Sequence, residues 1–400
     1  MKRFRSSRNA VTIIEVLFAT GIAIFGLIGI VSLIGVAGKQ ASQSNAATIS
    51  QALANQWFGD FVVRNFNFSP NWRVYNDQIT PAPTLASRFI TFDNSAVLAR
   101  GTSSGGTRVA YRHAICIDPL FFNDPSNLTE LLGSFPNTQA YRPGLFPYYQ
   151  DDLNPLSDPF TPSVYSTAPV NRPRLLRVGT TLTSSQVNRL FLSFDDQVVS
   201  IANVDDPTTT VDERDPTAPA TRRLTADGNQ FASKGEYSWF ATLCPRELLP
   251  MEGSKSENLY TMSLVVTKRR DRMFFKPMSS GTESVPAGER IADVAATANF
   301  QGGSGGRVVL SGSLGVNNKL GTGDWVMLSR YQSATGSVVL RWFRVIGLDA
   351  NPTEDKATGI WTRSVSLDGP DWIFDATFPT QATLVSNVVT VFERVVAVQH

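Results

Sequence analysis

The feature that most constrains this chain is an uncharged, apolar stretch near its N-terminus. No residue from Val16 to Gly38 carries a charge, and Glu15 and Lys39 bound the stretch. As a helix, it would measure about 35 Å, which is enough to cross a hydrocarbon core of about 30 Å. The stretch therefore predicts a membrane-spanning helix over residues 16–38, because the apolar region of a secretory signal peptide is shorter, at about 7–15 residues.

Basic residues lie mainly on one side of this stretch. Four of them, and no acidic residue, occur within the first eight positions, whereas only Lys39 follows the stretch before Asp60. By the positive-inside rule, this asymmetry predicts a cytoplasmic N-terminus and an exported region over residues 39–400. We therefore expect a single-pass protein of the cytoplasmic (inner) membrane with a large extracytoplasmic part.

The composition excludes several other classes of protein. With 42% hydrophobic and 18% charged residues, the chain is neither disordered nor a highly charged coiled coil. The net charge is +2, and four positive charges lie in the leader, so the rest lacks the basic footprint of a nucleic-acid-binding protein. Only two histidines, His113 and His400, and two cysteines, Cys116 and Cys244, are present. These numbers argue against zinc clusters and CxxC redox pairs.

The residues around the start of the apolar stretch form a recognisable order. A basic leader ends in the small residue Ala10, the string Val-Thr-Ile-Ile follows, and Glu15 precedes the long apolar run. This order resembles the processing site of type IV pilins and pseudopilins. The resemblance implies a leader peptide over residues 1–10 that prepilin peptidase cleaves between Ala10 and Val11, with N-methylation of Val11.

In that family, the fifth mature residue is a glutamate, and Glu15 occupies this position. The resemblance implies that its carboxylate neutralises the N-terminal ammonium of a neighbouring subunit during filament assembly. Unpaired, both charges would be costly in an apolar filament core. Three departures from the usual pattern favour a minor pilin or a pseudopilin over a major pilin: Ala10 in place of Gly, Val11 in place of Phe or Met, and Ser32 where major pilins often carry a helix-bending Pro.

The helix is expected to continue beyond the apolar stretch. Between residues 39 and 66, apolar residues recur at steps of three and four, as do polar residues on another face. This spacing is typical of an amphipathic helix. We therefore predict one N-terminal pilin helix over residues 11–66, with the membrane span at 16–38 and an amphipathic half at 39–66. Ser69-Pro70 would end it.

The remainder of the chain has the pattern of short strands separated by turn-rich connections. We expect an α+β protein in which the long membrane-spanning helix precedes a β-rich exported region, built as an antiparallel sheet with a small C-terminal barrel as one option. The Gly/Ser string at 301–306 suggests a boundary between a domain at 67–300 and a subdomain at 301–400. Strands are expected at Phe89–Phe92, Arg108–Ile117, Leu190–Phe194, Tyr237–Leu243, Tyr260–Thr267, Met273–Phe275, Val308–Leu310, Trp325–Arg330, Ser337–Ile346, Trp361–Leu367 and Asn387–Val396.

No constellation in the sequence predicts catalysis. Gly302–Gly306 matches a G-x-S-x-G pattern, but the segment before it is only weakly strand-like, a strand follows where a helix is needed, and only His113 or His400 could serve as the base, so we expect a spacer. Acidic loops near residues 151–158 and 205–215 match no calcium motif, so we expect no metal and no cofactor. Lys268, Arg269, Arg270 and Arg272 are predicted to form a charged hairpin tip, and nucleic-acid binding is unlikely. Cys116 and Cys244 are either a disulfide pair or two buried thiols.

The sequence therefore predicts a non-enzymatic structural subunit resembling a minor pilin. Its expected partners are prepilin peptidase, other pilin or pseudopilin subunits, the inner-membrane assembly platform and the membrane itself. It would move from the membrane to a filament at the cell surface. Two alternatives remain at this level: a type II secretion pseudopilin, and a membrane-tethered extracytoplasmic binding protein or enzyme.

Overall fold

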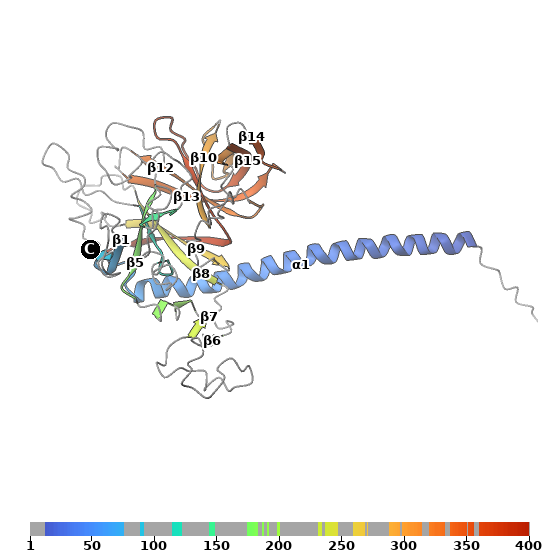
Figure 1. Ribbon diagram of the computed structural model, residues 1–400, viewed down its shortest axis with the longest axis horizontal. Coiled ribbons are helices and arrows are strands. Elements are labelled where there is room, and N and C mark those ends of the chain that lie inside the picture. Colours follow the sequence, from blue (N-terminus) through green and yellow to red (C-terminus); the bar gives the residue numbers. More distant parts are fainter. Residues whose placement is uncertain are drawn as a thin grey trace, which may run out of the picture. The chain divides into compact units, whose positions relative to one another are not determined.

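The fold is known from a computed structural model (Figure 1), which divides into two compact units, Met1–Ala52 and Leu53–His400. The described residues are 13–75, 89–91, 114–121, 144–148, 174–182, 186–187, 190–191, 198–200, 231–233, 237–246, 259–268, 270, 288–296, 298–313, 320–332, 337–349, 351–355 and 360–399. The predicted strand at Met273–Phe275 and most of that at Arg108–Ile117 lie outside them.

A single long helix, α1 (Ile13–Val63), forms the N-terminal part of the described chain. It ends three residues before the predicted limit, and its last turn shows why. Asn65 adopts a positive φ of 55°, the Phe66 N–H bonds to the Phe61 carbonyl at 3.0 Å, and the Asn65 N–H bonds to the Val62 carbonyl at 3.1 Å. This Schellman-type arrangement satisfies carbonyl groups at the helix end and turns the chain away before Pro70.

The prediction of a membrane span over residues 16–38 is contradicted. Within the described part of the chain, no helix offers a segment both long enough and apolar enough to cross a membrane. The predicted single-pass location in the inner membrane is contradicted by the same finding.

The larger unit contains two main β-sheets, and the first of them, which we call the sheet, has eight strands. Its strand order is β17-β9-β8-β3-β5-β1-β2, with β4 paired to β5. Only the β3–β5 pair is parallel. The strands are β1 (Trp72–Tyr75), β2 (Phe89–Thr91), β3 (Ile115–Ile117), β4 (Leu145–Phe146), β5 (Leu175–Thr180), β8 (Tyr237–Pro245), β9 (Leu259–Lys268) and β17 (Val388–Ala397). A separate two-stranded sheet pairs β6 (Val198–Ser200) with β7 (Phe231–Ser233).

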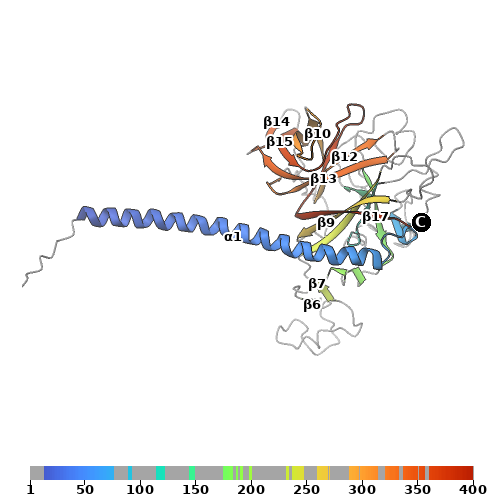
Figure 2. The same cartoon turned by 180° about the vertical axis from the view of Figure 1, so that it is seen from behind.

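The second main sheet closes on itself, and we call it the barrel. Its order is β11-β10-β16-β12-β13-β15, and β15 pairs with β11 as well as with β13, so six strands form a ring (Figures 1 and 2, orange and red). A short edge strand, β14, pairs with β15. The strands are β10 (Glu289–Ala296), β11 (Gly306–Ser313), β12 (Trp325–Gln332), β13 (Ser337–Leu348), β14 (Thr353–Asp355), β15 (Ile360–Asp368) and β16 (Gln381–Val385).

The sheet is covered on both faces within the larger unit. On one face, Trp239 of β8 packs against Trp57 of α1 with ring centroids 6.4 Å apart, and against Phe66 at 5.5 Å. On the other face, a second cluster of buried residues joins the sheet to the outer surface of the barrel, and it includes Phe240 of β8 and Trp342 of β13. Because neither face meets water, β8 is buried almost along its whole length, as in sheets covered on both sides.

The Gly/Ser string at 301–306 belongs to the barrel, where it leads from β10 into β11. Gly305 has a φ of +64°, and a Cβ atom placed on it would lie 1.9 Å from the Leu367 carbonyl oxygen. The glycine is therefore required both by the left-handed backbone and by the close approach of β15.

The predicted fold class is therefore wrong. The described chain is mostly β, with strands β1 to β17, the helix α1 and a single short 3-10 turn at Ser69–Asn71, and no described helix qualifies as membrane-spanning. The predicted strand at Leu190–Phe194 is described only at its first two residues, and there it is wrong: Leu190 is helical and Phe191 lies in a turn. Both side chains are buried, and Phe191 stacks edge-on against Trp57 at 6.3 Å.

Candidate functional site: an exposed apolar helix and a buried charge cluster

The residues predicted to direct processing and assembly lie at the start of α1. Ala10 and Val11 fall outside the described residues. Glu15 lies in the first turn of α1, and its side chain is exposed. A carboxylate in the first helical turn faces the unpaired backbone N–H groups, so its charge is favourable there.

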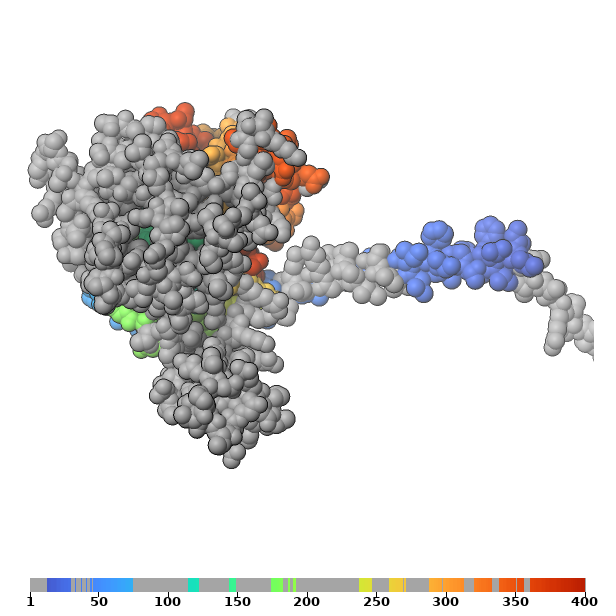
Figure 3. All heavy atoms as spheres, viewed as in Figure 1, coloured from blue at the N-terminus to red at the C-terminus, as the bar shows by residue number. Residues whose placement is uncertain are grey.

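The N-terminal half of α1 carries large apolar side chains on every side. Thr20, which interrupts them, bonds its hydroxyl to the Val16 carbonyl at 2.8 Å. Phe18 and Phe25 are 69% and 79% exposed, and Figure 3 shows the side chains of this stretch as blue spheres along the helix. The other exposed large hydrophobic residues here are Ile13, Ile14, Val16, Leu17, Ile22, Ile24, Leu27, Ile28 and Leu33. A helix that is apolar all round needs cover on all sides.

The two cysteines are free, buried thiols and do not form a disulfide with each other in this structure. The register of the sheet gives the reason. Cys116 of β3 lies opposite Thr242 of β8, and Cys244 is two residues further along β8. Such diagonal neighbours are about 7–8 Å apart, beyond the usual Cα separation of a disulfide. Burial raises the pKa of the Cys116 thiol well above its usual value, so this thiol is kept protonated.

Four charged side chains meet inside the larger unit, and we call them the charge cluster: Asp118, Arg177, Arg270 and Glu289. Asp118 follows β3, Arg177 lies within β5, Arg270 follows β9, and Glu289 is the first residue of β10. Their side chains are 0%, 0%, 4% and 1% exposed. Three elements of the sheet and one of the barrel thus supply the cluster.

Each carboxylate in the cluster contacts both arginines. Arg177 donates to Asp118 through Nη1 and to Glu289 through Nη2. Arg270 donates to Asp118 at 3.0 and 2.7 Å, and to Glu289 at 2.7 Å. Arg177 Nε also donates to the Leu145 carbonyl at 3.3 Å. Two anions and two cations therefore form a closed, electrically neutral network, which is the condition under which buried charges are tolerated.

Electrostatic interactions within the cluster keep the Asp118 carboxylate charged. Burial alone would raise the pKa of Asp118, but Arg270 and Arg177 outweigh burial and lower that pKa below its ordinary value. The Phe121 N–H, which donates to Asp118 at 3.2 Å, adds to the lowering. Burial in turn would lower the pKa of Arg270, and the two carboxylates raise it. Asp118 and Arg270 are therefore held in their ionised forms.

Aromatic rings enclose the cluster. The Arg177 guanidinium lies 4.0 Å from the centre of the Phe121 ring and 5.1 Å from that of Phe146, and Arg270 lies 4.8 Å from that of Phe240. The faces of the aromatic rings stabilise the two guanidinium cations, and the rings keep solvent away from the cluster. Through these pairings, the cluster links strands of the sheet to β10 of the barrel.

Sequence reasoning missed this cluster. Arg270 was predicted in a charged hairpin tip, but it is buried against Asp118, so this prediction is corrected. The signal was a single charge within each of several apolar strings, such as Arg177 in Leu-Leu-Arg-Val-Gly and Asp118 after Ile-Cys-Ile. The partners could not be paired from sequence because Arg177 lies 59 residues from Asp118 and 112 from Glu289.

Of the other residues singled out in the sequence, those that the structure describes form no further site. Ser304 is exposed, and its hydroxyl bonds to the Gln301 carbonyl at 3.2 Å. His113, His400 and the acidic loops at 151–158 and 205–215 lie outside the described residues. Among the described residues, no group of three or more histidine, cysteine, aspartate or glutamate side chains is placed to hold a metal ion.

Comparisons with known proteins add no relative. No family model, no curated protein and no solved structure matches this chain. The function is therefore argued from the residues themselves.

Proposed function

We propose that this protein is a structural, non-enzymatic subunit of a type IV pilus or related filament, similar to a minor pilin. The observation that carries the proposal is the exposure of apolar side chains all round the helix over Ile13–Gly29. Helices of other subunits are the occupants that could cover such a surface on every side at once. The proposed role rests on this packing of helix against helix.

Glu15 is the proposed register residue of the assembly. Cleavage by prepilin peptidase after Ala10 would create an ammonium group at Val11, and the carboxylate of Glu15 on one subunit would pair with that group on the next. A subunit in the wrong register would leave both charges unpaired in an apolar surrounding, which is costly. The partners of the protein would then be the peptidase, other pilin or pseudopilin subunits, and the assembly platform.

The size of the larger unit bears on the position in the filament. Residues Leu53–His400 form one compact unit, which is bulky for a subunit that repeats at every step. This favours a few copies, or a place at the tip. A type II secretion pseudopilin would use the same helix and the same glutamate, and it is the second candidate.

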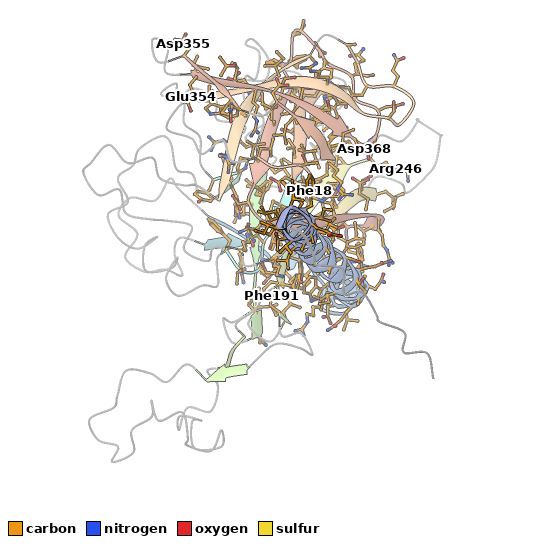
Figure 4. The ribbon with its side chains drawn as sticks, turned by 90° about the vertical axis from the view of Figure 1, so that its right-hand side faces the viewer. Phe18, Phe191, Arg246, Glu354, Asp355 and Asp368 are labelled. Atoms are coloured by element: carbon orange, nitrogen blue, oxygen red, sulfur yellow. The ribbon has the colours of Figure 1, made fainter. Side chains whose placement is uncertain are left out.

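The test is incorporation into filaments in cells that express the assembly machinery. We expect Glu15→Gln to reduce the amount of protein recovered with sheared filaments at least tenfold, because the charge pair is lost while the helix stays apolar. Glu354→Gln is the matched control, since Glu354 is an exposed glutamate of β14 in the barrel (Figure 4). Equal recovery of both variants would contradict the proposal.

A further inference from the structure

The barrel is inserted between two paired strands of the sheet. Strands β10 to β16 lie in the chain between β9 and β17, and β9 and β17 pair with each other along almost their whole length. The ends of these strands meet at the base of the barrel. The Lys268 N–H bonds to the Asn387 carbonyl at 2.9 Å, and the Ser386 N–H bonds to the Gly288 carbonyl at 2.9 Å.

The barrel has the features of a unit that can hold itself together. Its ring of six strands is closed by the β11–β15 pair, so its backbone ladder does not depend on the sheet. Its interior has its own buried cluster, which includes Phe300, Phe343 and Trp372. A module with a closed ladder and a core of its own can move as one body when its outer contacts are released.

The contact between barrel and sheet is different from that interior. It is a largely apolar layer that includes Met327, Leu340 and Trp342 of the barrel. In this layer, a hydrogen bond joins a side chain of β13 to a side chain of β8. Trp342 Nε1 donates to the Thr242 hydroxyl at 3.0 Å. The charge cluster lies at the same contact, at the base. Arg270 follows β9 and pairs with Asp118, whereas Glu289 begins β10 and pairs with Arg177 and Arg270.

We propose that the charge cluster is a clamp that holds the barrel docked on the sheet, and that breaking the clamp releases the barrel as a folded unit. The physical reason is the charge balance of the cluster. Removal of one charge leaves a net charge in a dry layer, and this is strongly unfavourable. Water can relieve that charge once the barrel lifts from the sheet, without any loss of the barrel's own ladder or core.

The protein carries its own reporters for this motion. Cys116 and Cys244 are its only cysteines, and both belong to the apolar layer between sheet and barrel. Their exposed fractions are 0% and 3%, so a thiol reagent reaches them only when this layer opens. The rate of thiol labelling under native conditions therefore measures undocking.

The experiment compares labelling rates in the full-length chain. We expect Glu289→Gln and Arg270→Met each to raise the labelling rate by about 100-fold, while hydrogen exchange of the β10–β16 ladder stays slow. The matched control is Arg363→Met, which removes another buried arginine, one that bonds inside the barrel to the carbonyls of Leu320 and Asp349. In this control, the rate of thiol labelling should rise only by the factor that the loss of global stability accounts for.

A second measurement on the unaltered protein keeps the proposal falsifiable if the variants do not fold. The labelling rate of the wild-type chain is measured at increasing urea concentration. Undocking exposes less surface than unfolding, so the clamp predicts a smaller urea dependence for labelling than for global unfolding. The proposal is overturned if labelling has the full urea dependence of unfolding, or if the barrel amides lose protection together with the thiols.

Discussion

Two phenylalanines illustrate how differently the two units treat the same side chain. Phe343 of β13 is fully buried, with ring centroids 5.6 Å from Phe300 and 6.1 Å from Trp372, whereas Phe18 of α1 is 69% exposed. The glutamates differ in the same way: Glu289 is buried between two arginines, and Glu15 is exposed. The unit Leu53–His400 thus buries Phe343 and Glu289 among its own side chains, while the N-terminal part of α1 leaves Phe18 and Glu15 exposed.

The largest effect on the free energy of unfolding is expected when phenylalanine is replaced by alanine in the larger unit, and the same replacement in α1 is the comparison. Phe343→Ala should lower the free energy of unfolding of the larger unit by about 3–5 kcal/mol, because it opens a cavity in the barrel interior. Phe18→Ala should change it by less than about 0.5 kcal/mol, since this side chain is exposed. Urea unfolding followed by tryptophan fluorescence measures both values. Similar losses in the two variants would break the comparison.

A smaller effect is expected at a glycine of the barrel turn. Gly305→Ala should cost about 2–4 kcal/mol, because alanine is strained at this positive φ and its Cβ would collide with the Leu367 carbonyl. Gly288→Ala is the matched control, since no atom lies within 4 Å of its Cβ position. Thermal unfolding should separate the two variants by several degrees. If Gly305→Ala melts with the wild type, the close packing of β11 on β15 is not as described.

The smallest effect is expected from acid, and its sign follows from Asp118. Because its pKa is lower in the folded protein than the unfolded value of about 3.9, its pairing stabilises the fold above that value. This contribution is lost as the pH falls through the folded pKa. Urea unfolding from pH 7 down to about pH 2.5 should therefore show a loss of stability below about pH 4. In Asp118→Asn, which starts from a lower stability, this part of the loss should be smaller; identical profiles would contradict the role of Asp118.

Much of the strand pattern was predictable because several strands carry continuous apolar strings. The predicted strands at Tyr237–Leu243, Tyr260–Thr267 and Ser337–Ile346 correspond to β8, β9 and β13. β8 and β9 belong to the sheet, which is buried on both faces, and the predicted parts of both strands carry no charged residue, so they stand out. The long helix was also predictable, from its periodicity, although not its end at Val63, which depends on the left-handed Asn65.

Two of the strands that were missed, β5 and β10, contain charges of the cluster. β5 carries Arg177, and β10 begins with Glu289 and Arg290, so charged residues interrupt the apolar pattern of both strands. Their burial becomes intelligible only when partners distant in the chain are brought together. Burial lowers the pKa of Arg290 to about 10, with Asp324 acting in the opposite direction. Local patterns do not contain such pairings, whereas Glu15 could be singled out because its motif is contiguous.

The central claim is that the exposed end of α1 is a processed assembly element, and the N-terminal peptide of the protein tests it most directly. The measurement is the mass of that peptide, and of the intact chain, in protein isolated from cells with an active prepilin peptidase. The account predicts a chain that begins at a methylated Val11 and lacks residues 1–10. A chain that still begins at Met1, in cells where other substrates of the peptidase are cleaved, would contradict it.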